Sequence, residues 1–218
     1  MTQPTLGQRA TAHAALGDVT RLALVDQLLV SDRSPQELQQ RLGIASNLLT
    51  HHLDVLEGAS LIVRGRSSGD GRRRYVHLLP LARRFLGAPA LDLHQPALFI
   101  CTANSARSQL AAALWARIVG VQAASGGTFL ASSVHPGALA AARKAGLDLS
   151  QAKPISFWKI KPRPSIVVTV CDQAHELLVG EDHWWHWSVP DPVEDGRSAA
   201  FDHTVDELKS RIHALIEA

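Results

Sequence analysis

The stretch Cys101–Ser108 constrains the fold more than any other, because an apolar run precedes it and a helical pattern follows it. The run Ala97–Ile100 predicts a buried strand, and residues 109–119 have the periodicity of a helix. A cysteine in the turn between them lies near the positive end of the helix, among backbone N–H groups that have no partner within the helix. Such a turn binds an anion and favours the thiolate form of its cysteine.

Arg107 and Ser108 complete this predicted site. The planar guanidinium of Arg107 can hold two oxygens of a bound anion, and the Ser108 hydroxyl can donate to the sulfur. We therefore expect Cys101 to be a nucleophile beneath a tetrahedral oxyanion. The residues expected to bind this oxyanion are Thr102, Ala103, Asn104, Ser105, Ala106, Arg107 and Ser108.

The spacing of Cys101, Arg107 and Ser108 resembles the signature of the low-molecular-weight tyrosine phosphatase superfamily and of the arsenate reductases built on that fold. The resemblance covers about residues 96–216 and implies an α/β domain with a parallel sheet. A late Asp-Pro in this superfamily supplies the general acid, and Asp191 matches it by order and context.

A second segment, residues 166–176, resembles the thioredoxin-coupled arsenate reductases, as do Val134-His135-Pro136 and His186-Trp187. Three cysteines relay electrons in those reductases, and Cys101 and Cys171 match the first two. The third is expected seven residues after Cys171, where this chain has Leu178. Three outcomes stay open: a Cys101–Cys171 disulfide that is reduced directly, attack of a small thiol on the Cys101–arsenate adduct, or a domain that only senses. Cys171 as a plain core residue is a further alternative.

The first 90 residues are basic, with 11 arginines, no lysine and 7 acidic residues (net +4), whereas residues 91–218 carry a net charge of −2. This asymmetry suggests that the first part meets nucleic acid. Helical patterns over residues 7–16, 18–29, 34–42 and 44–57 precede a glycine-tipped hairpin over residues 61–78, and a short helix is expected near residues 81–85. This order predicts a helix-turn-helix followed by a wing.

Three segments of this part resemble the ArsR-type winged-helix repressors: Leu16–Leu22, Thr50–Leu56 and Gly58–Ile62. The resemblance implies a homodimer that reads two-fold sites in double-stranded DNA, with the helix from Ser46 lying in the major groove. The residues that it places against DNA are Ser46, Asn47, Thr50 and His51 for the groove, and Arg64, Arg66, Arg72, Arg73 and Arg74 for phosphates or the minor groove.

Residues 1–100 contain no cysteine, which excludes the thiolate arsenite site found in many arsenic-sensing members of that family. The eleven histidines show no metal-site spacing, so no metal and no tightly bound cofactor is expected. The reductant would be an external thiol: thioredoxin, a glutaredoxin-like protein or a small thiol. The N-terminus lacks a signal-peptide pattern and no apolar run approaches a membrane span, so we expect a soluble, cytoplasmic protein with no membrane partner.

The sequence thus predicts a winged helix-turn-helix domain over residues 1–88, a linker over 89–96 and an α/β domain with a parallel sheet, of the phosphatase type, over 97–218. In the last domain we expect strands near 97–101, 128–133, 165–171 and 184–188, and helices near 106–119, 136–146, 173–179 and 199–217. The leading hypothesis is an arsenate reductase fused to an ArsR-type regulator of arsenic resistance. The alternatives are a protein tyrosine phosphatase fused to a DNA-binding domain, and a repressor whose second domain only senses or dimerises.

Overall fold

The computed structural model describes residues 3–86, 91–178 and 183–216. The contacts divide the chain into two compact units, one formed by residues 3–67 and 71–86 and the other mainly by residues 91–178 and 183–216. Residues 87–90, which include the first two residues of the expected linker, lie outside the described residues. Among the residues that the structure describes, no helix combines the length and the apolar character that a membrane crossing requires.

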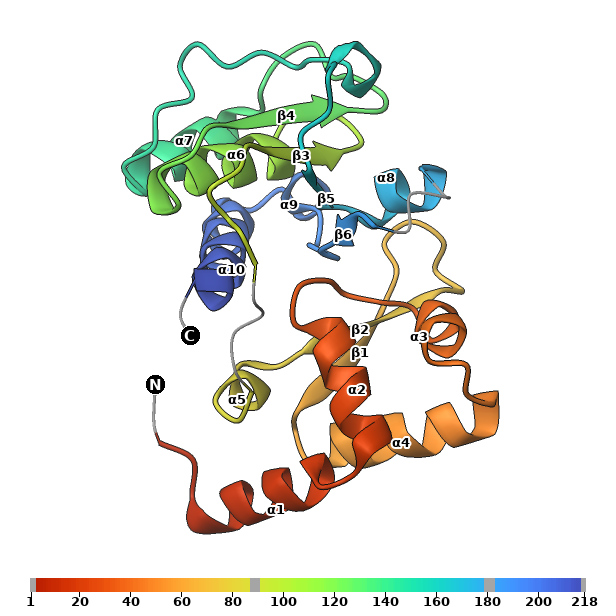
Figure 1. The fold of residues 1–218 in the computed structure, drawn as a ribbon. Helices are drawn as coiled ribbons and strands as arrows, with labels where there is room; N and C mark the ends of the chain where they lie inside the picture. Colours follow the sequence, from red (N-terminus) through yellow and green to blue (C-terminus); the bar gives the residue numbers. More distant parts are fainter. Residues whose placement is uncertain (1–2, 87–90, 179–182, 217–218) are drawn as a thin grey trace. The chain divides into compact units, whose positions relative to one another are not determined.

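The first unit contains five helices among its described residues, and Figure 1 shows them around a hairpin. Their bounds are α1 Leu6–Leu16, α2 Val19–Leu28, α3 Pro35–Leu42, α4 Ser46–Gly58 and α5 Pro80–Arg83. The strands of the antiparallel hairpin are β1 Ile62–Arg66 and β2 Arg74–Leu78, and their register pairs Arg66 with Arg74. Leu24, Leu28, Leu53, Leu56 and Val76 form the centre of the core beneath them.

Local capping explains where these helices begin. Asp18 accepts a hydrogen bond from the N–H of Arg21 at the start of α2. Ser34 and Glu37 form a reciprocal capping box at the start of α3, and Gly43 ends that helix in the left-handed conformation (φ 64°). Helix α4 differs, because its N-cap is Ala45, which has no side-chain acceptor. Ser46 does not replace the missing cap, since it is already the first residue of the helix.

The second unit is built on a parallel sheet with the strand order β4-β3-β5-β6, which confirms the predicted parallel sheet. The strands are β3 Ala97–Cys101, β4 Ala123–Gly127, β5 Ile166–Thr169 and β6 Trp185–His186. Every residue of β3 and β5 is buried, as expected for inner strands of a parallel sheet. Phe99 packs against Trp115 and Trp187, with ring centroids 5.7 and 5.8 Å away, at the centre of this unit.

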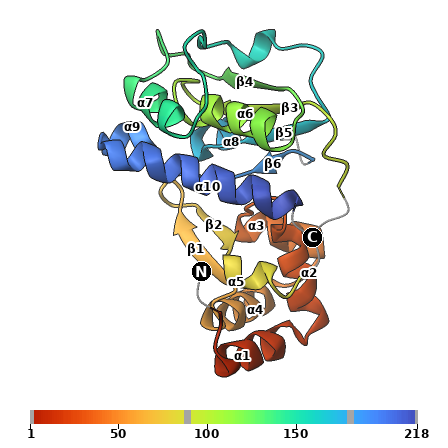
Figure 2. The same ribbon diagram turned by 90° about the vertical axis from the view of Figure 1, so that its left-hand side faces the viewer.

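Helices pack against this sheet, and the two views in Figures 1 and 2 show α6, α7 and α10 gathered together. Helix α6 packs against β3 and β4, while α10 packs against both α6 and α7. The helical elements are α6 Arg107–Ile118, α7 Pro136–Lys144, a 3-10 turn Phe157–Lys159, α8 Asp172–Leu177, α9 Pro192–Asp195 and α10 Ser198–Ile216.

The strand expected near residues 128–133 is wrong, because the sheet uses Ala123–Gly127 instead. Close packing explains the difference: a Cβ atom on Gly127 would lie 2.8 Å from the carbonyl oxygen of Thr102. The strand therefore needs small residues at this position, although glycine has a low strand propensity and favours the prediction of a turn. The more apolar Phe129 and Leu130, which favoured the wrong prediction, are 67% and 47% exposed in the loop after β4.

The uncapped start of α4 generates a stability prediction. Ala45 is exposed and has an extended backbone (φ −68°, ψ 147°), so a threonine fits there and its hydroxyl can accept from the first turn of α4. Ala45→Thr should raise the free energy of unfolding of the first unit by about 1 kcal/mol, measured by urea denaturation. Ala45→Val has the same shape without the hydroxyl and is the control; equal effects of the two variants would contradict the cap.

Candidate active site

The predicted site lies in the loop between β3 and α6. Cys101 is the last residue of β3 and is 2% exposed, and α6 begins at Arg107. Asn104 has a left-handed backbone (φ 51°), which asparagine tolerates better than most residues. This backbone conformation turns the loop toward the Cys101 sulfur.

The peptide groups of this loop have a common orientation. The carbonyl oxygens of Cys101, Thr102 and Ala103 accept hydrogen bonds from N–H groups of the segment after β4, which lie 3.2, 2.9 and 3.0 Å away. The carbonyl of Ser105 accepts from the N–H of His135 at 2.8 Å. Across a trans peptide the C=O and the next N–H point in opposite directions, so the N–H groups that follow these carbonyls face the inside of the loop. The N–H of Asn104 accordingly donates to the Cys101 sulfur at 3.2 Å.

The side chain of Asn104 stabilises the loop from within. Its amide nitrogen donates to the hydroxyls of Ser108 (2.8 Å) and Ser125 (2.9 Å), and its carbonyl oxygen accepts from the N–H of Ile155 (2.8 Å). Ser108 lies 3.0 Å from the Cys101 sulfur. Because the Ser108 oxygen already accepts from Asn104, its proton is available to the sulfur.

Arg107 is 6% exposed, and its guanidinium is held at two points. One nitrogen donates to the carbonyl of Val189 at 3.0 Å, and another donates to the carboxylate of Asp191 at 2.5 Å. The other oxygen of Asp191 accepts from the N–H of Val193 and caps α9. The guanidinium and the carboxylate predicted to act on an oxyanion are therefore in direct contact with each other.

Cys171 is the N-cap residue of α8, and its sulfur accepts from the N–H of Ala174 at 3.4 Å. The hydroxyl of Thr102 lies 3.3 Å from the same sulfur. Burial, followed by the nearby Cys101, raises the pKa of the Cys171 thiol to about 11, whereas Arg107, Thr102 and Ala174 oppose this rise. Cys101, Arg107 and Cys171 thus belong to one electrostatic cluster, in which Cys171 is a thiol at neutral pH.

The structure brings the predicted loop, Arg107, Asp191 and Cys171 together in the second unit. Sequence reasoning missed the groups that support them, because most are backbone groups or side chains remote in the chain. Gln109 is an example: its amide donates to the backbone and side-chain oxygens of Asn104 at 3.2 and 3.1 Å. Within residues 3–86, 91–178 and 183–216, no group of three histidine, cysteine or acidic side chains is arranged to hold a metal ion.

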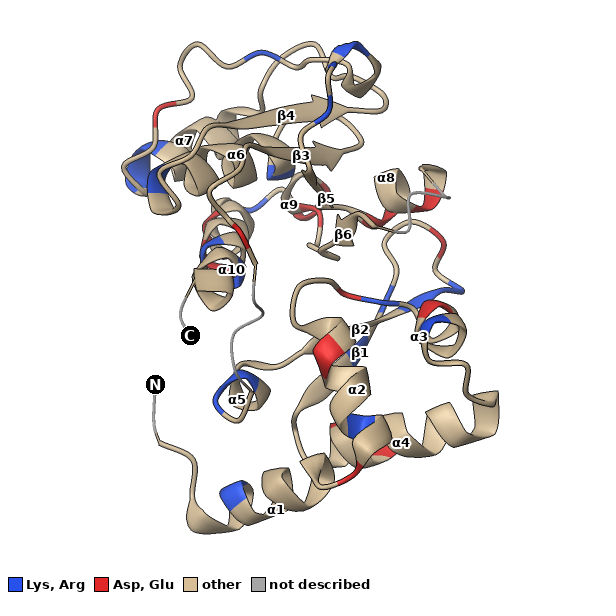
Figure 3. Ribbon diagram, viewed as in Figure 1, with Lys and Arg blue, Asp and Glu red and all other residues tan. Residues whose placement is uncertain are grey.

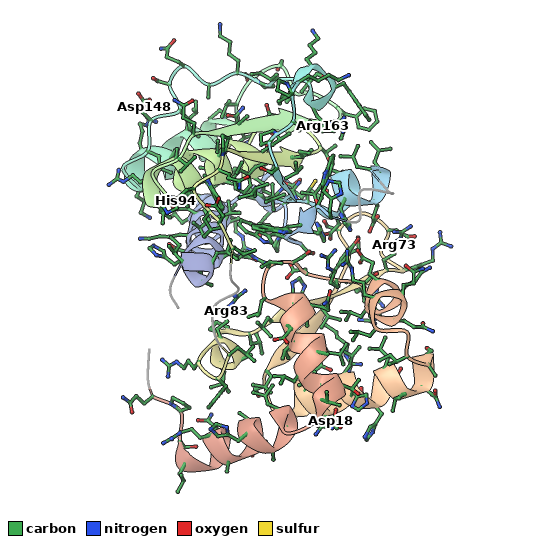
Figure 4. All side chains as sticks on the ribbon, in the orientation of Figure 1. Asp18, Arg73, Arg83, His94, Asp148 and Arg163 are labelled. Atoms are coloured by element: carbon green, nitrogen blue, oxygen red, sulfur yellow. The ribbon has the colours of Figure 1, made fainter. Side chains whose placement is uncertain are left out.

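The residues predicted to contact DNA lie in the first unit, which Figure 3 colours by charge. Ser46, Asn47, Thr50 and His51 form the exposed face of α4, whereas Leu49 and Leu53 on the opposite face are buried. Arg66, Arg72, Arg73 and Arg74 are exposed on the hairpin, and Figure 4 labels Arg73 there.

Arg64 differs from the other hairpin arginines. Its guanidinium donates to Asp54 at 2.7 Å and also to Glu57, and these carboxylates raise its pKa, Glu57 most strongly. The structure therefore assigns Arg64 two partners on α4, and it is the weakest of the candidates for a phosphate contact.

The contact between Arg107 and Asp191 generates a binding prediction. An incoming oxyanion must compete with the Asp191 carboxylate for the guanidinium. Asp191→Asn should therefore tighten the binding of inorganic phosphate by about fivefold, as expected for removing a competing ion pair worth ~1 kcal/mol. Isothermal titration would measure this. Asp195→Asn is the matched control, because Asp195 lies on the same short helix but pairs with Arg197; unchanged affinity in Asp191→Asn would contradict the competition.

Comparisons with known proteins agree with this geometry. Residues 97–218 match the family model described as low molecular weight phosphotyrosine protein phosphatase. Arsenate reductase 2 of Staphylococcus epidermidis is 34% identical over 123 residues, which cover 54% of this chain and 92% of that protein. Arsenate reductase of Bacillus licheniformis is 32% identical over 138 residues, covering 55% and 93%.

Among solved structures, the tyrosine phosphatase AmsI of Erwinia amylovora is similar in fold, with a TM-score of 0.50 and 14% identity over 60% of this chain and 96% of that one. The family model begins at the first residue of β3 and matches more than half of the sequence. This chain therefore belongs to the low molecular weight phosphotyrosine protein phosphatase family.

Proposed function

We propose that the second unit is an arsenate reductase that uses Cys101 as its nucleophile. The observation that carries this proposal is the loop after Cys101, whose inward N–H groups and nearby guanidinium suit a tetrahedral oxyanion. The curated relatives named above are arsenate reductases, which supports the choice of arsenate over other oxyanions. A second thiol beside the first supports reduction over simple hydrolysis.

The proposed reaction has two steps. The Cys101 thiolate attacks arsenic, an S–As bond forms, and an oxygen leaves as water after Asp191, once it is protonated and released from Arg107, gives it a proton. The Cys171 thiol then gives its proton to an oxygen of the bound arsenical, and its sulfur attacks the Cys101 sulfur. An S–S bond forms while the S–As bond breaks, and its electron pair stays on arsenic, which leaves as arsenite. Each sulfur loses one electron and arsenic gains two.

We propose a small thiol as the reductant that restores the two cysteines. The chain has no third cysteine, and Cys101 and Cys171 are 2% and 1% exposed. A protein thiol cannot reach sulfurs that are covered to this extent unless the structure opens, whereas a small thiol can follow the route of the anion. Thioredoxin and glutaredoxin-like proteins are therefore second choices for this chain.

The rival activity is phosphate-ester hydrolysis, which the description of the family model favours. It would use the same Cys101, Arg107 and Asp191 through a phosphocysteine intermediate, but it has no step for a second thiol. Cys171 therefore separates the two functions.

Two cysteine variants test this assignment. Cys101→Ser should abolish both arsenate reduction and phosphate-ester hydrolysis, because both need the nucleophile. Cys171→Ser should abolish arsenate reduction but leave any ester hydrolysis unchanged. Arsenite release and p-nitrophenol release, each measured with a small thiol present, would report the two activities. Arsenate reduction that survives in Cys171→Ser would rule out the second step.

We propose that the first unit is a winged helix-turn-helix of the ArsR type, over residues 1–88, that binds double-stranded DNA as a homodimer. The exposed polar face of α4 and the exposed arginines of the hairpin after it support this proposal. The order of the helices and the hairpin also fits such a module. In this proposal the chain joins an arsenic-resistance regulator to its reductase, and a repressor with a non-catalytic second unit is the alternative.

Arginine variants test the DNA-binding proposal. Replacing Arg72, Arg73 and Arg74 by alanine should weaken binding to operator DNA and flatten its salt dependence by about 0.9 per lost phosphate contact in a log–log plot. Fluorescence anisotropy at several salt concentrations would measure both. Arg64→Ala is the control, because its charge is already balanced by Asp54 and Glu57. Equal salt slopes in the triple variant and the parent chain would contradict the wing.

A further inference from the structure

A buried aspartate–histidine pair lies directly beside Cys171 and has no part in the proposed reaction. Asp172 is 2% exposed and His186 is fully buried. Nε2 of His186 lies 3.1 Å from the Asp172 carboxylate. Although burial raises the pKa of Asp172, its hydrogen bond and charge interaction with His186 lower that pKa, and the net result is about 2.

The ring of His186 is held at both nitrogens. Its Nδ1 lies 3.0 Å from the hydroxyl and 3.3 Å from the carbonyl oxygen of Thr169. Nε2 faces the Asp172 carboxylate, which accepts when ionised, so Nε2 carries a proton. The ring thus connects Thr169 to Asp172.

This connection spans the turn that contains Cys171. Thr169 ends β5 and pairs in register with His186 of β6, while Asp172 begins α8. Residues 170 and 171 lie between the two points that the ring holds. The opposite side of the turn is held by β3, because the N–H of Val170 donates to the carbonyl of Ile100 at 2.7 Å.

The Cys171 sulfur itself is held less firmly than its backbone. Its contacts with Thr102 and Ala174 are 3.3 and 3.4 Å long, which is typical of weak hydrogen bonds to sulfur. Since attack on a disulfide-forming sulfur needs close alignment, the position of the backbone decides whether Cys171 can reach Cys101. No contact described for the oxyanion loop involves His186 or Asp172.

We infer that His186 and Asp172 are positioning residues that hold Cys171 for the second step of the reaction and leave the first step unaffected. This inference rests on the proposed function, because it assigns a task within the proposed disulfide-forming step. It makes His186 more than a packing residue of β6. Disruption of the pair should slow disulfide formation without weakening oxyanion binding.

The experiment measures the two steps separately in the full-length chain. Reduced protein is mixed with arsenate without external thiol, quenched with acid and an alkylating agent, and analysed by mass spectrometry for loss of two thiols. His186→Gln and Asp172→Ala should slow this loss on the order of tenfold to 100-fold, as misplacement of a reacting group does. Asp172→Asn keeps an acceptor for His186 and should fall between Asp172→Ala and the parent chain.

Inorganic phosphate binding, measured by isothermal titration, reports whether the oxyanion loop is intact. The inference expects unchanged phosphate affinity in all three variants. His203→Gln, an exposed histidine of α10, is the substitution control. Parent-like rates of disulfide formation in His186→Gln and Asp172→Ala would overturn the inference, and so would a matching loss of phosphate binding, which would indicate a general structural role. A parent chain that forms no disulfide with arsenate would instead overturn the proposed function, and the inference with it.

Discussion

The orientation of the peptide groups between β3 and α6 is the constraint on which the second unit depends. Four carbonyls of this loop bond outward to the segment between β4 and α7, and this leaves N–H groups inside. Backbone donors that already point inward need not reorient when an anion binds, so no free energy is lost in reorganising them. The same arrangement explains the left-handed backbone of Asn104, the glycine at position 127 and the position of β4. Each of these features permits the loop after β3 to lie against the segment after β4.

A single guanidinium beside this loop interacts with more than one of the candidate catalytic groups. One guanidinium, that of Arg107, contacts Asp191 and also acts on Cys171, so a change in its partner alters both groups. The Asp172–His186 pair holds the turn that contains Cys171 from another side. A buried polar pair of this kind contributes little net stability but fixes geometry, because breaking it leaves a buried group without its partner.

Much of this arrangement could be predicted from the sequence, where local rules are strong. The apolar run before Cys101, the helical pattern after Arg107 and the capping box at Ser34 each depend on neighbours within a few residues. The position of β4 could not be predicted, because its glycines are required by contacts with Thr102 and Phe157, which are distant in sequence. The partners of Arg64 could not be predicted for the same reason. The run of arginines suggests phosphate contacts for all of them, whereas Asp54 and Glu57 of α4 bind the guanidinium of Arg64.

The burial of both cysteines has a consequence for selectivity among oxidants. A sulfur that is exposed reacts with peroxides and disulfides at rates set by its own chemistry. Here the sulfurs of Cys101 and Cys171 are covered, and the N–H of Asn104 donates to the Cys101 sulfur, an environment that suits the oxyanion of the proposed reaction. In the proposed reaction, burial therefore restricts the oxidants of the pair to small tetrahedral oxyanions and its reductants to small thiols, and it protects the two sulfurs from larger disulfides.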